Sequence, residues 1–131
     1  MVNNYYLLSE EETELQLMVR DFMEREVKPV VAECDEKSEV PMEAVKKAIG
    51  MGLHCMNIPE KYGGMGLTAR MMTVIREEFG KVDAGFSVTM ANNCLGSTPT
   101  MVFGTEAQKQ KLADVVVPGG FSPFCLTEPG A

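Results

Sequence analysis

A pair of capping boxes constrains the fold of this chain more than any other feature. Ser9 with Glu12, and Thr105 with Gln108, each place a hydroxyl residue three positions before Glu or Gln, so that both side chains can bond backbone N–H groups at a helix start. Apolar residues follow at a spacing of three or four, the period of one helix face. Those after the first box are Leu15, Met18, Val19, Phe22 and Met23. The sequence therefore predicts an all-α chain of amphipathic helices.

Proline and glycine mark further helix boundaries. Pro29 interrupts the first helix, which we expect to resume beyond it because a kinked helix tolerates proline. Pro41 is expected at the first position of a short second helix that ends near Gly50. Residues 53–66 contain a proline and a cluster of glycines, which is typical of an ordered loop.

Residues 68–81 are predicted to form a third helix with one buried face. Residues 84–96 carry no charge, which suits a helix surrounded by others or lining a pocket. Thr98 followed by Pro99 then indicates the start of a separate helix that ends at Gly104. In the third helix we expect Met71 or Met72, Ile75 and Phe79 to be buried, and Arg70, Arg76 and Glu77 to lie near solvent.

The character of the chain changes after the turn Pro118-Gly119-Gly120. Residues 121–127 lack helix formers and lie between turn residues, so we predict an extended strand there. Such a strand has no obvious partner in a helical chain.

Composition excludes several classes of function. The formal net charge is -7, with 19 acidic and 12 basic residues and no basic stripe, which argues against a nucleic-acid partner. No stretch approaches the ~20 apolar residues that a membrane span needs, and the N-terminus lacks the basic start of a secretory signal, so we expect a cytoplasmic protein. The cysteines show no CxxC spacing, so they are predicted to be free thiols, and no metal site is expected. They are Cys34, Cys55, Cys94 and Cys125.

Local patterns alone assign little chemistry. His54 is the only histidine, and a histidine without a partner suggested by the sequence is usually structural. The glycines of residues 62–66 can cradle a phosphate or form a tight turn with positive φ angles. The turn is favoured, because no strand precedes these glycines and no Lys-Ser/Thr follows them. Thr127 and Glu128 precede a Pro-Gly turn, where they can face a ligand of a kind that the residues do not specify.

Four segments, in order along nearly the whole chain, resemble the acyl-CoA dehydrogenase family. The last of them resembles the flavin-binding signature of that family and is the most specific. The segments are Ile58-Pro59-Glu60-Lys61-Tyr62-Gly63-Gly64-Met65-Gly66-Leu67, Glu77-Glu78-Phe79-Gly80-Lys81-Val82-Asp83-Ala84-Gly85, Gly104-Thr105-Glu106-Ala107-Gln108-Lys109 and Phe124-Cys125-Leu126-Thr127-Glu128-Pro129-Gly130-Ala131.

The resemblance implies a flavoprotein with an N-terminal helical domain, a middle β-domain and a C-terminal four-helix bundle, usually assembled as a tetramer. Residues 1–120 would form the helical domain, and residues 121–131 would begin the β-domain and end inside the flavin-binding signature. The implied reaction removes the α proton of an acyl-CoA thioester with a glutamate, while the β hydrogen passes as hydride to FAD. The electrons then continue to an electron-transfer flavoprotein. Because that glutamate belongs to the C-terminal bundle, no catalytic residue is expected in this chain.

The resemblance also implies binding residues. Four positions of the signature would lie against the flavin, with the Thr127 hydroxyl bonded to its ring: Phe124, Cys125, Leu126 and Thr127. The helix over residues 85–96 resembles the one that lines the acyl pocket, so the candidates for contact with the acyl chain are Val88, Ala91, Asn92 and Leu95. These four share one helical face. Ordinary packing between helices is the alternative for them.

Other functions stay open at this point. The chain can instead be a stand-alone helical binding or assembly module without catalysis. Acyl-CoA oxidases and flavin monooxygenases are relatives of the family, and a fold does not fix a reaction. We also expect an exposed apolar face, where further domains would pack, and therefore self-association.

Overall fold

The computed structural model describes residues 7–130. Residues 1–6, on which the absence of a targeting signal was judged, and Ala131, the last residue of the fourth motif, lie outside the described residues. The described part is helical and contains no β-strand, which confirms the predicted all-α class. Its elements are α1 (Glu10–Phe22), the π-helical turn η2 (Met23–Val27), α2 (Lys28–Lys37), α3 (Met42–Gly50), the 3-10 turn η3 (Glu60–Tyr62), α4 (Ala69–Val82), α5 (Ala84–Phe103) and α6 (Glu106–Val116).

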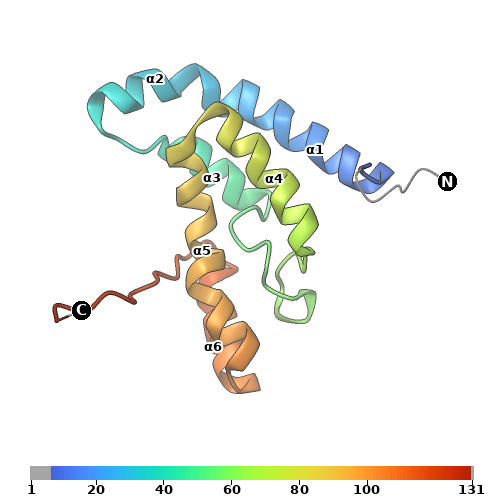
Figure 1. Ribbon diagram of the computed structural model, residues 1–131, viewed down its shortest axis with the longest axis vertical. Coiled ribbons are helices and arrows are strands. Elements are labelled where there is room, and N and C mark those ends of the chain that lie inside the picture. Colours follow the sequence, from blue (N-terminus) through green and yellow to red (C-terminus); the bar gives the residue numbers. More distant parts are fainter. Residues whose placement is uncertain (1–6, 131) are drawn as a thin grey trace.

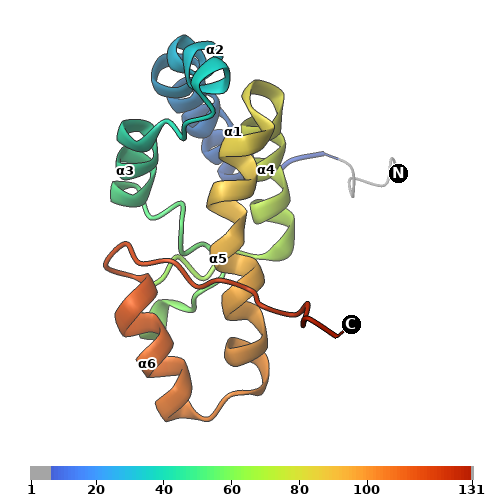
Figure 2. The same cartoon turned by 90° about the vertical axis from the view of Figure 1, so that its left-hand side faces the viewer.

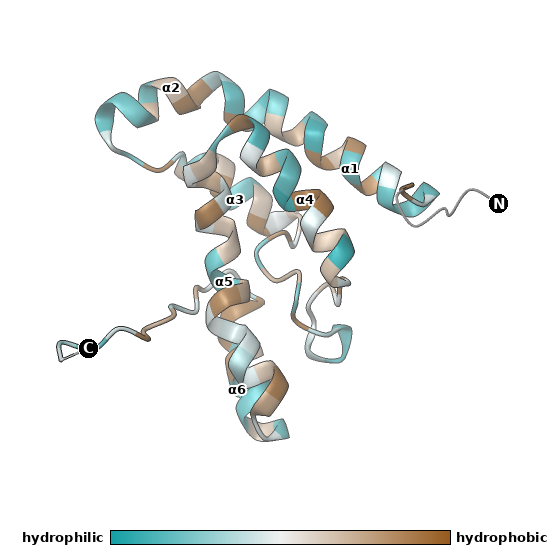
Figure 3. Ribbon diagram, viewed as in Figure 1, coloured by the Kyte–Doolittle hydropathy of each residue, from teal (hydrophilic) through white to brown (hydrophobic). Residues whose placement is uncertain are grey.

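The helices form two packed groups joined by the long α5. The first half of α5 packs with α4, and α4 packs on α1 (Figure 1). In the second group, α6 folds back beside the last turns of α5, as both views show (Figure 2). Hydrophilic and hydrophobic residues alternate along α1, as its amphipathic pattern predicts (Figure 3).

Both capping boxes form as predicted. At α1 the Glu12 N–H donates to Ser9 Oγ at 3.1 Å, and the Ser9 N–H donates to Glu12 Oε2 at 2.9 Å. At α6 the Gln108 N–H donates to Thr105 Oγ1 at 3.3 Å, and the Thr105 N–H donates to Gln108 Oε1 at 2.8 Å. These bonds pair N–H groups that a helix start otherwise leaves free.

The chain stays helical beyond Pro29, as predicted. The π-helical turn η2 lies just before this proline. Pro29 lies in the first turn of α2, a position at which proline is tolerated. Met23 and Val27 in the turn are buried, whereas α2 itself has no fully buried residue. Met18, which the spacing assigned to the buried face of α1, is exposed.

The main core lies between α1, α3, α4 and α5. Ile75 and Phe79 are buried there as predicted, while Met71 and Met72 are half-buried. The Phe79 ring packs edge-on against Phe86 of α5, with 5.4 Å between the ring centroids. This is a favourable geometry for an aromatic pair.

The predicted helix start at Thr98 is wrong, because α5 continues through Pro99 to Phe103. The Thr98 hydroxyl does not cap a new helix but donates backward to the Cys94 carbonyl oxygen at 2.5 Å. Asp83 instead caps α5 at its start, where its Oδ1 accepts from the Phe86 N–H at 2.5 Å. The helix is also not surrounded by others, since Phe86 and Met90 are buried but Val88 and Leu95 on another side are exposed.

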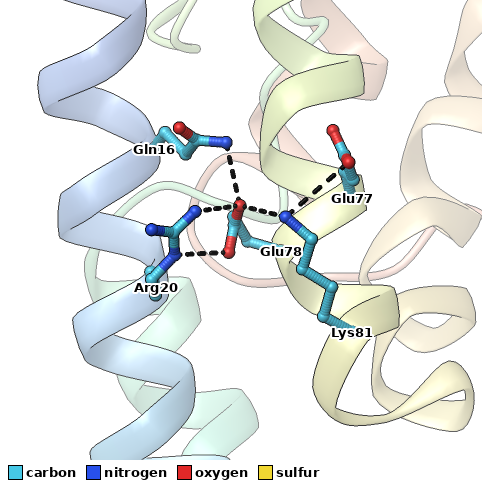
Figure 4. A network of polar contacts seen from close by, with 5 residues as sticks. All are labelled: Gln16, Arg20, Glu77, Glu78 and Lys81. Atoms are coloured by element: carbon cyan, nitrogen blue, oxygen red, sulfur yellow. Dashed lines mark hydrogen bonds and ion pairs between the residues drawn. The ribbon is translucent and has the colours of Figure 1, made fainter.

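A buried carboxylate joins α1 to α4 (Figure 4). The side chain of Glu78 is only 2% exposed. Arg20 donates from Nε to Oε2 at 3.0 Å and from Nη2 to Oε1 at 2.9 Å, and Gln16 and Lys81 donate to Oε1 at 2.9 and 2.8 Å. The Arg20 hydrogen bonds are the main cause that lowers the pKa of Glu78 to about 2. No local pattern in the sequence indicated this cluster.

The predicted strand over residues 121–127 does not form among the described residues. The segment leaves the end of α6 and runs across α5 as an irregular tail (Figure 2). A strand is defined by hydrogen bonds to a neighbouring strand, and the described part offers none.

Large apolar side chains are exposed around the C-terminal end of α5. Phe103 is 88% exposed, and Val102 and Val115 are also exposed. A cluster of this kind favours association. We therefore expect the 131-residue chain to self-associate as its concentration rises, and a Phe103→Asp variant to do so less. Sedimentation velocity over a concentration series measures this, and a clean monomer at the highest concentration would contradict it.

Among residues 7–130, every helix is too short or too polar to span a lipid bilayer. All four cysteines are free thiols: Cys55 and Cys94 are buried, Cys34 is half-buried and Cys125 is exposed.

Candidate functional site

A groove of about 470 Å³ lies between α4 and α5. Three of the four predicted acyl-contact residues, Val88, Ala91 and Leu95, line it from α5. The other lining residues come from the loop before α4, from α4 and from α5: Asn57, Met72, Arg76, Cys94 and Thr98.

Helix geometry explains which candidates the groove brings together. At 100° per residue, Val88, Ala91 and Leu95 lie within about 60° of one another around α5. The α5 residues that line the groove also include Cys94 and Thr98, and Asn92 lies about 100° from the middle of this whole set, at the edge of the face. It is exposed and is not among the lining residues. The groove can hold an extended apolar chain against the α5 side chains.

Asn57 provides a polar part of the wall with a fixed orientation. Its Nδ2 donates to Ser97 Oγ at 2.9 Å and to Thr98 Oγ1 at 3.3 Å. Both hydroxyls already donate to backbone carbonyl oxygens in the preceding turn of α5, so they can only accept from the amide. The amide oxygen Oδ1 is buried and has no hydrogen-bond partner among the described residues.

Arg76 lies in the groove and not at the solvent-facing position predicted for it. The residue is half-buried, and its Nε is a buried donor without a partner in the described part of the chain. Sequence reasoning missed it because a charged residue was assigned to solvent by default. The available signal was its position four residues after Met72, which places both side chains on one face of α4.

The predicted flavin contacts lie on the tail after α6, away from the lining of this groove. Phe124 and Leu126 are exposed, as are Cys125 and Thr127. The backbone groups of these four residues make no hydrogen bond within the described structure. The segment therefore presents free backbone donors and acceptors beside exposed apolar side chains.

Asn93 and Gly96 of α5 fix the start of this tail. The Asn93 side chain donates from Nδ2 to the Gly120 carbonyl oxygen at 3.1 Å and accepts from the Ser122 N–H at 2.7 Å. Asn93 is fully buried. Gly96 lies directly beneath the tail, where a Cβ atom would overlap the Ser122 carbonyl oxygen.

We expect a Gly96→Ala variant to release the tail from α5, because the added methyl group meets backbone and not a flexible side chain. Overpacking of this kind costs about 1–3 kcal/mol. Hydrogen exchange at the Ser122 amide measures the effect as lost protection. Gly80→Ala is the matched control, since nothing lies within 4 Å of its Cβ position, and it should leave that amide protected. Equal protection in both variants would contradict the role of Gly96.

The histidine and the glycine cluster have structural roles. His54 is buried, and its Nε2 lies 2.9 Å from the Val116 carbonyl oxygen, which holds the loop against the end of α6. Gly63 and Gly66 have φ angles of 88° and 60°, which L side chains rarely adopt. This confirms the prediction of a tight turn.

A second cavity, of about 640 Å³, lies between the end of α5, α6 and the first residues of the tail. Phe103, Leu112, Phe121 and Pro123 are among its lining residues. None of the predicted site residues lines it, and the sequence did not indicate it.

Comparison with known proteins relates this geometry to a family. Residues 9–119 match the family described as acyl-CoA dehydrogenase, N-terminal domain. The chain is 37% identical to a 3-(aryl)acrylate reductase of Clostridium sporogenes over 120 residues, which are 89% of this chain and 32% of that protein. The chain thus spans about a third of the length of this curated relative.

Solved structures share the arrangement of the helices. A chain of the structure described as "Electron transferring flavoprotein of Acidaminococcus fermentans: Towards a mechanism of flavin-based electron bifurcation" superposes with a TM-score of 0.86 at 35% identity, covering 96% of this chain and 34% of that one. An acyl-CoA dehydrogenase from Bacillus anthracis complexed with FAD gives a TM-score of 0.81 at 31% identity, covering 95% and 22%. The family match spans all six α-helices, so this chain belongs to the acyl-CoA dehydrogenase family and comprises its N-terminal helical domain.

Proposed function

We propose that this chain acts within a flavin-dependent acyl-CoA dehydrogenase that carries out α,β-dehydrogenation of an acyl-CoA thioester. In this proposal residues 1–120 form the helical domain and residues 121–131 begin a β-domain. The observation that carries it is the α4–α5 groove, which places Val88, Ala91 and Leu95 together in a family member. The catalytic glutamate is not among the residues of this chain.

The tail fits the role of a flavin contact. The free backbone groups of Phe124 to Thr127 can bond the polar edge of an isoalloxazine ring, while Phe124 and Leu126 can cover its apolar part. The Thr127 hydroxyl is a further donor for the ring. The bound FAD would accept the hydride from the acyl β-carbon. The part of this chain is to hold and orient, because Asn93 fixes the start of the tail on the same helix that lines the groove.

The groove would bind the acyl chain and exclude water from it. When a hydrocarbon chain covers the apolar side chains of α5, the complex is stabilised by about 25 cal/mol per Å² of buried apolar area. Asn92, at the edge of this face, would contact the acyl group only near the groove mouth.

The partners follow from the same proposal. The complete protein would pass electrons to an electron-transfer flavoprotein, work in the cytoplasm and assemble as a tetramer. The exposed apolar residues around Phe103 support further packing. Oxygen consumption measured against dye reduction separates a dehydrogenase from an oxidase or monooxygenase.

An Ala91→Trp variant tests the groove directly. The indole would fill space that the acyl chain needs, so we expect acyl-CoA to bind at least about tenfold more weakly, which corresponds to about 1.4 kcal/mol. Titration calorimetry of the flavin-loaded protein with hexanoyl-CoA measures the change.

Ala107→Trp is the matched control, because Ala107 is exposed on α6 and lines neither cavity. It should leave the affinity unchanged. The flavin content of both variants should match the unsubstituted protein, since Ala91 is not part of the tail. If no acyl-CoA binds to the unsubstituted protein, or if neither flavin nor acyl-CoA binds, the proposed function is wrong and the stand-alone module is favoured.

A further inference from the structure

Arg76 differs from the other arginines of the chain. The sequence contains four arginines, and three of them form ion pairs. Arg76 lines the α4–α5 groove, and its Nε is buried without a hydrogen-bond partner among the described residues. A guanidinium stays ionised at any physiological pH, and a desolvated charged donor is costly unless an acceptor meets it. The three ion pairs are Arg20–Glu78, Arg25–Asp21 and Arg70–Glu12.

The groove supplies no such acceptor from its own charged residues. Met72 and the α5 side chains make the wall apolar, and no Asp or Glu is among the residues that line it. The positive charge of Arg76 is therefore the only formal charge on the groove wall within the described structure. An occupant with a complementary negative group would remove the cost of leaving this donor unpaired.

The chain itself shows how such a group would dock. Arg20 uses Nε and Nη2 together, so that one edge of the guanidinium meets both oxygens of Glu78. Paired bonds of this kind are strong and directional. On Arg76 the Nε of this edge is buried and has no hydrogen-bond partner among the described residues, and the side chain lines the groove.

We propose that Arg76 binds a carboxylate carried by the acyl group, so that the groove selects acyl-CoA thioesters of dicarboxylic acids. This inference rests on the proposed function, in which the groove holds the acyl group. The apolar wall contacts the methylene groups, and the guanidinium pairs with the terminal carboxylate.

Asn57 limits where the carboxylate can lie. Its buried Oδ1 is an acceptor, because the bonds from Nδ2 to Ser97 and Thr98 fix the amide orientation. A carboxylate has no proton to donate to this oxygen, so it must meet Arg76 and not Asn57. A terminal hydroxyl can serve both atoms, which makes a hydroxyacyl thioester the informative competitor.

The test compares three thioesters of equal chain length: hexanoyl-CoA, ω-hydroxyhexanoyl-CoA and adipoyl-CoA, which ends in a carboxylate. Their affinities for the flavin-loaded protein are measured by calorimetry without an electron acceptor. Adipoyl-CoA is expected to bind most tightly. Arg76→Met, which keeps an apolar stem, should weaken adipoyl-CoA binding by about 10- to 100-fold, the range of a hydrogen bond to a charged group, and leave hexanoyl-CoA binding unchanged.

Two further variants keep the result interpretable. Arg25→Met removes an exposed arginine on the π-helical turn and should change none of the three affinities. Arg76→Lys retains the charge but not the planar edge, so it should recover part of the adipoyl-CoA affinity, which a purely structural role for Arg76 would not produce.

The two proposals fail in different ways. If hexanoyl-CoA binds normally but Arg76→Met leaves adipoyl-CoA unaffected, or weakens all three ligands equally, the assignment of Arg76 is overturned and the proposed function stands. Tightest binding of ω-hydroxyhexanoyl-CoA overturns the carboxylate in favour of a hydroxyl. If none of the three thioesters binds, the proposed function fails as well.

Discussion

A Phe79→Ala variant is expected to lower the free energy of unfolding by about 3–5 kcal/mol, the largest effect of a single truncation in this chain. Phe79 is fully buried and packs edge-on against Phe86, so its loss removes both the burial of a large ring and an aromatic pair. The cavity would lie between α4 and α5. The two helices could fill it only by moving toward each other, which would shift the residues that line the groove. For a domain of this size, the midpoint of thermal unfolding should fall by roughly 10–20 °C.

Thermal unfolding followed by circular dichroism measures this change, with Phe103→Ala as the control. Phe103 is 88% exposed, and its truncation should shift the free energy of unfolding by no more than about 0.5 kcal/mol. Because Phe79→Ala also displaces α5, the protection of the Ser122 amide should fall with it. Similar midpoints for the two variants would contradict the core assigned to α4 and α5.

The second large effect is expected for Glu78→Gln, which should lower the free energy of unfolding by about 1.5–3 kcal/mol at neutral pH. Gln has the shape of Glu but cannot pair with Arg20 and Lys81 as an anion. Both partners are about half exposed and can regain water, so the cost stays below that of breaking a fully buried pair. Chemical denaturation at several pH values measures the difference.

The sign of the pH dependence follows from the lowered pKa. Glu78 has a pKa of about 2 in the folded chain against an ordinary 4.5, so the folded state binds its proton more weakly than the unfolded state. The stabilisation from Glu78 is complete above pH 4.5 and is lost as the pH falls toward 2. The difference in stability between the unsubstituted chain and Glu78→Gln should therefore shrink over this range.

Glu106→Gln is an informative comparison. Hydrogen bonds from Tyr62 and Lys61 lower the pKa of Glu106 to about 2 as well, but this carboxylate is exposed at the surface. Solvent screens such contacts, so Glu106→Gln should lower the free energy of unfolding much less than Glu78→Gln does. An effect of Glu106→Gln as large as that of Glu78→Gln would show that burial is not what makes the Glu78 cluster important.

Local signals in the sequence predicted those features that depend on residues close together in the chain. Ser9 and Thr105 form their capping boxes because each bond spans only three positions. The glycine turn is equally local, since Gly63 and Gly66 take φ angles that other residues avoid. The spacing on α5 likewise brought Val88, Ala91 and Leu95 to one groove.

Features that depend on distant residues were not predictable in this way. Glu78 and Arg20 are 58 positions apart, and nothing in either local pattern indicates that they meet. Thr98 has the composition of a helix cap, but the packing of α5 lets its hydroxyl bond backward and the helix continue through Pro99. Arg76 is half-buried and lines the groove together with Asn57 and residues of α5, a neighbourhood that helix periodicity alone does not reveal.

The amide of Asn93 has a consequence for the register of the tail. A primary amide carries one donor side and one acceptor side, as a peptide group does, so Asn93 acts toward Gly120 and Ser122 as a single rung of a neighbouring strand. Side chains alternate along an extended backbone, and a slip by one residue exchanges its two faces. Because Ser122 is held on α5, pairing of the tail with a β-strand would set which face Phe124 and Leu126 share and which face Cys125 and Thr127 share.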